Sequence, residues 1–412
     1  MKGTVLFIGG RQNPHERLAE LRSARSLGLD IILLARKIPF YVRELIVEGV
    51  EVDLDDYSAV ESVAVALDEA YHFKGVVAWS ETDVPLKNRI SRTLGLPSMS
   101  EIAVLNSRNK VAMRKCLSTL KSLIPLFHEV NSLEEARVAA LNIGFPVIIK
   151  PSSGSGSKGI FKVNNDTELE SAVANLRTIA TKEFDSVFQA FGGTWVVEEF
   201  LDGIEYSVEG YVYNNIIQIV GLTDYESDEL TFVETSHIFP SNAPEAVRLE
   251  IEACAKIVVS AMGINNTTFH LECKYTKCGF KLIECAARPA GGYISTHLAE
   301  IGTGNSHLQN YIKVCCGVEP SVVKRPNNYI GIRYLYATQP GIYMGIDNIE
   351  LTLSDPVVQH LYLHFKPGQA VALPPDDYST QRVGAIIGIS ESYQKLNQVL
   401  TERAAEIKVK IV

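Results

Sequence analysis

The stretch that decides how this chain folds is Phe145-Pro146-Val147-Ile148-Ile149-Lys150-Pro151-Ser152-Ser153-Gly154-Ser155-Gly156-Ser157-Lys158-Gly159-Ile160. It predicts a buried strand that ends in a lysine and runs into a loop of small residues. Phosphates need such an arrangement, because backbone N–H groups come close only where side chains are small, and because a lysine adds a point charge. The spacing of a Walker A loop is absent, and a plain Ser/Gly linker is the alternative interpretation.

A second feature is a pair of predicted strands farther along the chain. The segments 268–276 and 280–286 alternate apolar and polar residues, as half-buried strands do. If Lys277-Cys278-Gly279 forms a three-residue hairpin loop with Gly279 in the left-handed conformation, Thr276 faces Phe280. The register of the two strands is then fixed.

In this register Glu272 lies directly across from Glu284. Two like charges in that relation destabilise a sheet, but a divalent cation between them makes the pair favourable, and Mg²⁺ binds carboxylates together with substrate phosphates. A solvated acidic edge and a protonated glutamate are the alternatives. Arg288 follows, placed either to hold a phosphate or to form a structural salt bridge. Gly291 and Gly292 behind it allow a substrate to approach the backbone.

A third feature is the segment 196–208, in which an apolar strand ends in Glu198-Glu199 and a second strand opens with Glu205. Exposed backbone at such a strand exit suits the edge of an adenine ring, and Glu205 is placed to bond ribose hydroxyls. Acidic pairs at strand ends are usually only solvated. This feature alone is therefore a weak indication, and it is interpreted together with the other features.

The first hundred residues alternate predicted strands and helices, which indicates an open α/β domain with a parallel sheet. Ligands of such sheets lie beyond the carboxyl ends of the strands. Gly9-Gly10 follows the first strand but lacks the later glycine of a dinucleotide-binding fingerprint. The predicted strands are 4–8, 30–35, 47–52 and 75–79, and the predicted helices are 15–27 and 58–70.

Glu81 and Asp83 follow the last of these strands. If the segment stays extended, the two side chains share a face, and together they favour a cationic group such as a substrate ammonium, arginine or lysine. The alternative is that they cap the next helix, because Asp83 precedes Val84-Pro85 and proline suits a first helical turn.

Later segments continue the mixed pattern. The sequence predicts a helix over 108–120, strands near 147–150, 159–163 and 195–199, a hairpin over 205–222 that turns at Asn214-Asn215, and a helix over 244–262. Beyond Pro320 several short strands and a last helix near 393–403 predict a small β-rich region.

The composition of the 412-residue chain, with 46% hydrophobic and 21% charged residues, is that of a folded protein with two or three domains. The net charge of −9 argues against a nucleic-acid or anionic-membrane partner. No apolar run reaches the roughly 18 residues of a membrane span, and the apolar start predicts a first strand, not a signal peptide.

The odd count of seven cysteines indicates reduced thiols in the cytoplasm. A zinc site at Cys273, Cys278 and Cys285 would lack a fourth ligand.

In this order and spacing, the features resemble those of the ATP-grasp superfamily over about residues 100–300. The resemblance implies ATP held between two antiparallel-sheet subdomains, with residues 152–159 as a mobile loop over the phosphates. The implied contacts are Lys110, Lys150, Ser153, Ser155 and Gly156 for phosphates, Glu198, Glu199, Phe200 and Leu201 for adenine, Glu205 for ribose, Glu272 and Glu284 for Mg²⁺ (or Mn²⁺ as a substitute), and Arg288 for the transferring phosphate and the acyl intermediate.

The chain departs from the superfamily at one position. Many members carry Glu-x-Asn-x-Arg on the second metal strand, whereas here Ala286 stands at the asparagine position, which removes one usual ligand of a second ion. The segment 234–241 resembles the substrate side of a narrower branch, the L-amino-acid ligases of the bacilysin-synthesis type. This makes His237 a catalytic and substrate-binding candidate beside Arg288, with an ordinary loop histidine as the alternative.

The resemblance implies an ATP-dependent ligase that joins two L-amino acids through an acyl phosphate and releases ADP and phosphate. The alternatives are another ATP-grasp ligase or carboxylase that acts on bicarbonate or a purine-pathway intermediate, and a non-catalytic ATP-binding module. The expected fold combines α/β and α+β parts: an open parallel α/β domain (1–106), a two-part ATP-grasp core (107–202 and 203–319) and a small C-terminal β-rich region (320–412). The expected partners are amino acids and ATP, with a homodimer as an open option.

Overall fold

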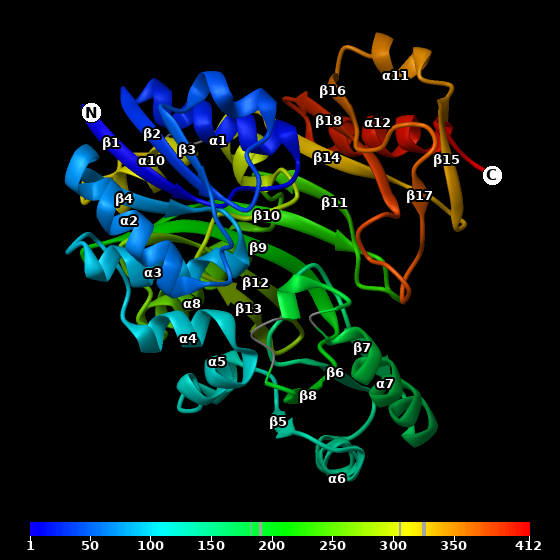
Figure 1. The fold of residues 1–412 in the computed structure, drawn as a ribbon. Helices are drawn as coiled ribbons and strands as arrows, with labels where there is room; N and C mark the ends of the chain where they lie inside the picture. Colours follow the sequence, from blue (N-terminus) through cyan, green and yellow to red (C-terminus); the bar gives the residue numbers. More distant parts are fainter. Residues whose placement is uncertain (182, 189–191, 305, 324–326) are drawn as a thin grey trace.

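The N-terminal part of the molecule is a parallel sheet in the order β3-β2-β1-β4, as the sequence predicted (Figure 1). The computed structural model describes residues 1–181, 183–188, 192–304, 306–323 and 327–412. Apolar side chains of α1 and α10 cover one face of this sheet, and those of α2 and α3 cover the other. The bounds are β1 (Gly3–Ile8), α1 (Pro14–Ser26), β2 (Leu29–Ala35), β3 (Glu48–Glu51), α2 (Tyr57–Tyr71), β4 (Phe73–Ala78), α3 (Val84–Thr93) and α10 (His307–Cys315).

The single helix expected over 108–120 is wrong. Two helices, α4 (Glu101–Arg108) and α5 (Lys110–Cys116), meet at Asn109. Asn109 has an extended backbone, and its side-chain oxygen accepts a hydrogen bond of 2.9 Å from the N–H of Ala112, so it caps α5. The break places Lys110 in the first turn of α5, where its N–H donates to the carbonyl of Ser152 at 2.6 Å. The loop of small residues that follows β6 is thereby tied to α5.

Residues 127–199, which we call the lid subdomain, form an antiparallel sheet in the order β5-β8-β6-β7. Val147 and Ile149 point inward from β6 and pack with the buried faces of α6 and α7. The strand expected over 195–199 is confirmed, whereas β7 is shorter than expected because residues 157–160 belong to the loop. The bounds are β5 (Phe127–Val130), α6 (Leu133–Ile143), β6 (Val147–Pro151), β7 (Phe161–Val163), α7 (Asp166–Ile179) and β8 (Trp195–Glu199).

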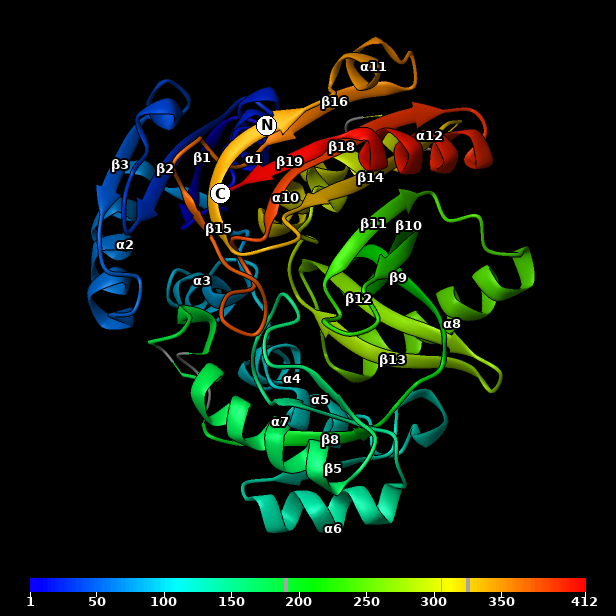
Figure 2. The same ribbon diagram turned by 90° about the vertical axis from the view of Figure 1, so that its right-hand side faces the viewer.

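A long, mainly antiparallel sheet in the order β13-β12-β9-β10-β11-β14-β18-β16 forms the centre of the molecule. Strands from beyond residue 320 continue it through the pairing of β11 with β14. In Figure 2 the lid subdomain lies below this sheet, and the strands β14 and β18, with α12 beside them, form its upper end. The bounds are β9 (Gly203–Tyr213), β10 (Ile216–Ser227), β11 (Glu234–Phe239), α8 (Glu245–Ala261), β12 (Thr267–Thr276), β13 (Gly279–Ala286), β14 (Tyr329–Tyr336), β16 (Val358–Leu363), β18 (Arg382–Ser390) and α12 (Tyr393–Glu406). The other elements are α9 (Ala299–Gly302), α11 (Glu350–Ser354), and the small sheet of β15 (Gly341–Asp347), β17 (Ala370–Val371) and β19 (Lys408–Ile411).

The hairpin of β12 and β13 brings the two predicted metal glutamates together by a route that differs from the expected one. Thr276 faces Gly279, not Phe280, because the loop is one residue tighter than expected. Gly279 does have a positive φ of 87°, as expected. An irregularity between Glu272 and Cys273 restores the missing residue, so that Glu272 lies opposite Glu284.

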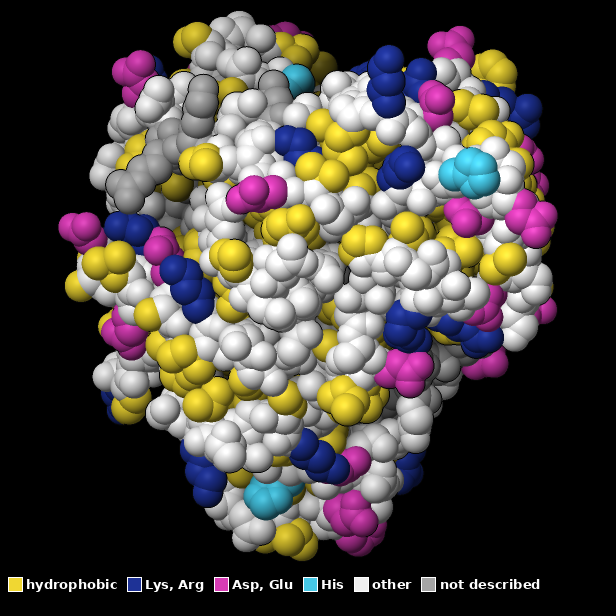
Figure 3. All heavy atoms as spheres, turned by 90° about the vertical axis from the view of Figure 1, so that its left-hand side faces the viewer, with side chains coloured by type: hydrophobic (Ala, Val, Ile, Leu, Met, Phe, Trp, Pro, Cys, Tyr) yellow, Lys and Arg dark blue, Asp and Glu magenta, His cyan; other side chains and the backbone are white. Residues whose placement is uncertain are grey.

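Charged side chains of both signs lie on the surface of the molecule (Figure 3). On the face drawn in Figure 3, acidic and basic side chains are interspersed and do not gather into an area of one sign. Among the helices in the described part of the chain, none is long and apolar enough to cross a bilayer.

Candidate active site

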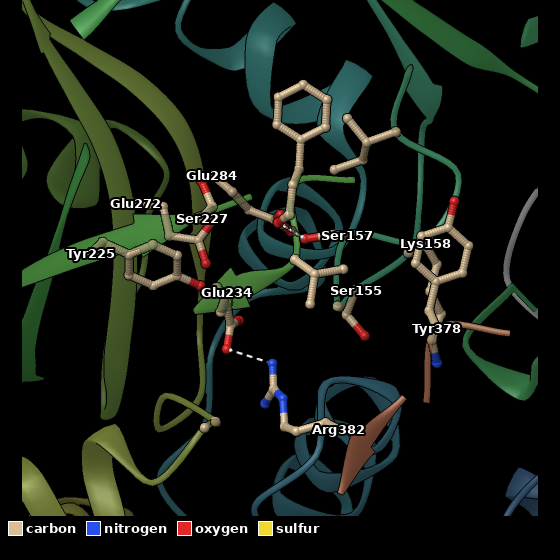
Figure 4. Close-up of a pocket in the computed structure, with 18 of the residues that line it drawn as sticks. Ser155, Ser157, Lys158, Tyr225, Ser227, Glu234, Glu272, Glu284, Tyr378 and Arg382 are labelled. Atoms are coloured by element: carbon tan, nitrogen blue, oxygen red, sulfur yellow. Dashed lines mark hydrogen bonds and ion pairs between the residues drawn. The ribbon is translucent and has the colours of Figure 1, made fainter. Parts of the chain in front are cut away.

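A cavity of about 940 Å³ opens where the four parts of the chain meet. The lid subdomain forms one wall and the central sheet forms another. Residues 12–16 of the N-terminal part and residues 363–366, 378–380 and 382 of the C-terminal part line the remaining sides. Tyr378 and Arg382 are labelled in Figure 4. The predicted residues that line it are Lys110, Lys150, Ser155, Gly156, Glu198, Glu199, Phe200, Leu201, Glu205, Glu272, Glu284, Arg288, Gly291 and Gly292.

Glu198 and Lys150 form the buried base of the lid wall. The Oε2 atom of Glu198 lies 2.8 Å from Nζ of Lys150, and its Oε1 lies 2.7 Å from Nε of Arg114. Burial would raise the pKa of Glu198, but Arg114 and Lys150 together lower it to about 2. The Glu198 side chain therefore neutralises two cations, and Glu198 lines the cavity within the predicted adenine hinge.

The two facing glutamates each have a basic partner. Nζ of Lys110 lies 3.1 Å from Glu284, and Nε2 of His270 lies 3.1 Å from Glu272. His270 also contacts the buried Glu209 at 2.9 Å. Burial would lower the pKa of His270, but these two carboxylates raise it to about 10. The negative charges of Glu272 and Glu284 are thus each balanced by a neighbouring basic side chain at the cavity wall.

The pair fits a magnesium ion in the form that nucleotide sites use. Within the described residues no group of three or more His, Cys, Asp or Glu side chains converges as a metal site would require. Mg²⁺ in such sites takes one or two carboxylates and completes its shell with substrate phosphates and water. Glu272 and Glu284 supply those two carboxylates, and Ala286 lines the cavity without adding a ligand. Of the cysteines considered for zinc, Cys278 is exposed at the hairpin turn whereas Cys273 and Cys285 are buried.

Glu205 lines the same cavity. Burial, and then the neighbouring Glu272, raise its pKa to about 7. Its Oε2 accepts a hydrogen bond of 3.4 Å from the hydroxyl of Ser227. A carboxyl group that is held partly protonated can both donate to and accept from sugar hydroxyls, which suits the predicted ribose contact.

The Ser/Gly loop is folded over the cavity in this structure. Gly156, Ser157 and Gly159 have positive φ values of 68°, 60° and 72°, which explains the need for small residues. The Ser157 hydroxyl donates to the carbonyl of Phe232 at 2.6 Å. This hydrogen bond joins the loop to the segment between β10 and β11 of the central sheet. Ser153 is buried and does not line the cavity, unlike Ser155.

Arg288 is held from behind by the N-terminal part. Its Nε lies 2.7 Å from Oε2 of Glu81, whose Oε1 lies 2.6 Å from Nη1 of Arg108. The backbone after Arg288 is fixed by Arg11, which donates to the carbonyl of Ala290 at 2.5 Å. Although burial opposes it, the two arginines lower the pKa of Glu81 to about 2.

The extended conformation expected at Glu81 and Asp83 is wrong, because these residues form a 3₁₀ turn before α3. Glu81 is buried against its two arginines, behind the cavity wall instead of within it. Asp83 stands at the N-cap position of α3 but its side chain makes no capping hydrogen bond, and burial raises its pKa to about 6. Neither Glu81 nor Asp83 lines the cavity.

The cavity is also lined by residues that were not predicted as site residues, although Glu234 belongs to the segment 234–241 that the sequence singled out. Glu234 contacts Nε2 of His237 at 3.3 Å and Nη2 of Arg382 at 3.3 Å. His237 itself is 1% exposed and is packed against the ring of Tyr225 at 4.2 Å between centroids. It therefore lies behind Glu234. The other cavity residues that were missed include Asn13, Glu16, Tyr225, Tyr293, His364 and Tyr378.

Comparisons with known proteins agree with this geometry. Residues 143–297 match the family model of the ATP-grasp domain. The chain is 24% identical to the uncharacterized protein y4rH of Sinorhizobium fredii, over 98% of this chain and 82% of that protein. It is 30% identical to the alanine–anticapsin ligase of Bacillus subtilis, over 54% of this chain and only half of that protein's length. The structure of an L-amino acid ligase from Bacillus licheniformis superposes with a TM-score of 0.88 at 22% identity, over 100% of this chain and 99% of that one.

The chain therefore contains an ATP-grasp domain, and its fold is that of the Bacillus licheniformis L-amino acid ligase structure. It resembles the L-amino-acid ligases of the bacilysin-synthesis type. Both statements agree with the resemblance found in the sequence.

The buried position of Glu198 predicts a large loss of stability in Glu198→Gln. The substitution leaves Arg114 and Lys150 without their counter-ion, so we expect the free energy of unfolding to fall by about 3 kcal/mol. Because the pKa of Glu198 is lowered, its contribution is present above about pH 4.5 and is lost as the pH falls toward 2. Urea denaturation measures both effects.

The matched control is Glu129→Gln, on the neighbouring strand β5, whose carboxylate pairs with Lys115 at the surface. Surface pairs contribute roughly 0–1 kcal/mol, so this variant should unfold almost as the wild type does. Equal denaturation midpoints for the two variants would show that the Glu198 pair does not stabilise the lid subdomain.

The position of Glu81 predicts that Glu81→Gln lowers the turnover number and leaves substrate selectivity unchanged. Without the carboxylate, Arg288 loses the partner that orients it, and we expect a fall of about 10- to 100-fold. Turnover and the ratio of efficiencies for arginine and leucine substrates are measured together. Glu101→Gln, which breaks the exposed pair with Arg92, is the control. A changed arginine-to-leucine ratio would assign Glu81 to substrate recognition instead.

Proposed function

We propose that this protein forms an amide bond between two L-amino acids, giving a dipeptide through an acyl-phosphate intermediate, with ATP and Mg²⁺. The observation that carries the proposal is the facing pair of Glu272 and Glu284, with Lys110 and Arg288 on the same cavity. The names of two proteins that the chain resembles, an alanine–anticapsin ligase and an L-amino acid ligase, support amino acids as substrates.

The chemistry explains why these groups are needed. A carboxylate is a poor acyl donor because its leaving group would be oxide, and transfer of the γ-phosphoryl group of ATP converts that oxygen into phosphate. Lys110 and Lys150 stabilise the charge that develops on the transferring group, and Arg288 stabilises the acyl phosphate. Bound Mg²⁺, or Mn²⁺ in its place, would be held by Glu272 and Glu284 and would neutralise phosphate charge.

The amine of the second substrate then attacks the acyl carbon. The new C–N bond forms as the C–O bond to phosphate breaks, and the amine loses a proton. The acyl phosphate would also react with water, so the closed Ser/Gly loop, joined to Phe232 through Ser157, serves to exclude it. In this scheme residues 198–201 hold adenine, and Glu205 holds the ribose.

A substrate panel tests the proposal. Wild-type protein is incubated with ATP, Mg²⁺ and every pair of the twenty L-amino acids, with bicarbonate as a separate arm, and released phosphate and products are measured. We expect a dipeptide together with ADP and orthophosphate, because the acceptor oxygen attacks the γ-phosphate. AMP and pyrophosphate, or phosphate release with bicarbonate alone, would contradict the proposal.

The acyl-phosphate site predicts that Glu284→Gln and Arg288→Ala each lower turnover by about 100-fold or more, because each removes a charge that acts on the transferring group. Circular dichroism should stay unchanged. The controls are Glu226→Gln and Arg333→Ala, which break an ion pair of 3.2 Å on strands β10 and β14 that do not supply this part of the site. Turnover near that of the wild type in a folded Arg288→Ala variant would remove Arg288 from the site.

A further inference from the structure

Arg382 brings a permanent positive charge into the cavity from the C-terminal region. It is the first residue of β18, and its side chain, a quarter of which is exposed, lines the cavity. Figure 4 shows its guanidinium group pointing toward Glu234, across from the loop that carries Ser155 and Ser157. Arginine stays protonated in proteins, so this charge is present at every working pH.

The guanidinium group is held in place by its neighbours, but not all of its N–H donors are used in hydrogen bonds to them. Its Nε donates to the hydroxyl of Tyr336 at 3.0 Å, its Nη2 donates to Glu234 at 3.3 Å, and its Cζ lies 3.9 Å from the centre of the Tyr334 ring. Within the described part of the chain, Nη1 makes no hydrogen bond. A guanidinium group has five donors along distinct edges, so it can bind Glu234 on one edge and a second anion on another.

Arg382 lines the same cavity as Arg288. In Figure 4 the Tyr225 side chain lies beside both Glu234 and Glu272. A Cβ atom at Gly292, four residues after Arg288, would lie 3.0 Å from Glu234 and 2.5 Å from the hydroxyl of Tyr334. Glycine at this position therefore lets the side chains of Tyr334 and Glu234 approach the backbone that follows Arg288.

The proposed reaction brings two carboxylates into this cavity, and they have different fates. The carboxylate of the acyl donor is consumed at Arg288, where it becomes the acyl phosphate. The carboxylate of the other substrate, the acceptor that supplies the amine, stays charged throughout and needs a separate counter-ion. Burying an uncompensated carboxylate is costly, so a fixed arginine is the group expected to meet it.

We propose that Arg382 binds the carboxylate of the acceptor and thereby restricts acceptors to free amino acids. This inference rests on the proposed function, and it adds the substrate class of one subsite. The Glu234 and Tyr336 contacts orient the guanidinium group, so Arg382 acts on specificity through direct contact with the substrate, and Arg288 acts on the acyl phosphate.

The test compares each of the twenty L-amino acids with its own carboxamide as the acceptor, at a saturating concentration of the donor. In the wild type we expect the free acid to be preferred. In Arg382→Met the efficiency with the acid should fall by about 10- to 100-fold through a higher KM, and the efficiency with the carboxamide should stay within about threefold. Arg382→Lys, which keeps the charge but not the fork, should recover part of the preference.

Arg333→Met on the neighbouring strand β14 is the control for the loss of an arginine from this sheet, because Arg333 pairs with Glu226 and does not line the cavity. Equal losses for acid and carboxamide in Arg382→Met would assign Arg382 a structural role and overturn the inference. A higher KM for the donor alone would overturn it as well. A wild type that releases no phosphate with any amino-acid pair would instead overturn the proposed function, and this inference with it.

Discussion

Two buried carboxylates, each held between two cations, fix the geometry on which the rest of the site depends. Glu81 in the N-terminal part bridges Arg108 and Arg288, and Glu198 in the lid subdomain bridges Arg114 and Lys150. Removing such charges from water is expensive, and the cost is offset only when the partners are well placed. These ion pairs therefore exist only when the separate parts of the chain are correctly docked.

The helices α4 and α5 are the common element of these pairs. Three cations in this short stretch face three carboxylates from different parts of the molecule: Arg108 faces Glu81, Lys110 faces Glu284, and Arg114 faces Glu198. A continuous helix would place residues 108, 110 and 114 at fixed angles around one axis. The break at Asn109 changes the direction of the chain between Arg108 and Lys110, so that one segment serves the N-terminal part, the central sheet and the lid.

The sequence predicted the cavity walls formed by the lid subdomain and by the β12–β13 hairpin better than the walls formed by the N-terminal and C-terminal parts, for physical reasons. Lys150 and the facing pair Glu272 and Glu284 follow from local patterns of strand and turn, and even a wrong hairpin loop led to the right pair because a bulge compensated for it. Glu81 was predicted to point into the cavity because an extended segment was assumed, and the 3₁₀ turn directs it to arginines that are distant in the sequence. Arg382 carried no local signal at all, because only the long-range pairing of β14 with β18 brings it to the cavity.

This difference also bears on what the matched domain says about the chain. The matched domain, residues 143–297, contains Lys150, Glu272, Glu284 and Arg288, the groups that the proposed function assigns to phosphate. The cavity walls formed by residues 12–16, 363–366, 378–380 and 382 lie outside it, and they carry aromatic, imidazole and guanidinium groups. The match therefore supports the phosphoryl chemistry of the proposed function, whereas the proposed choice of amino acids rests on side chains that only the tertiary fold brings to the cavity. Under that proposal, selectivity has to be argued from those walls, where the substrate carboxylate would meet the Arg382 guanidinium group.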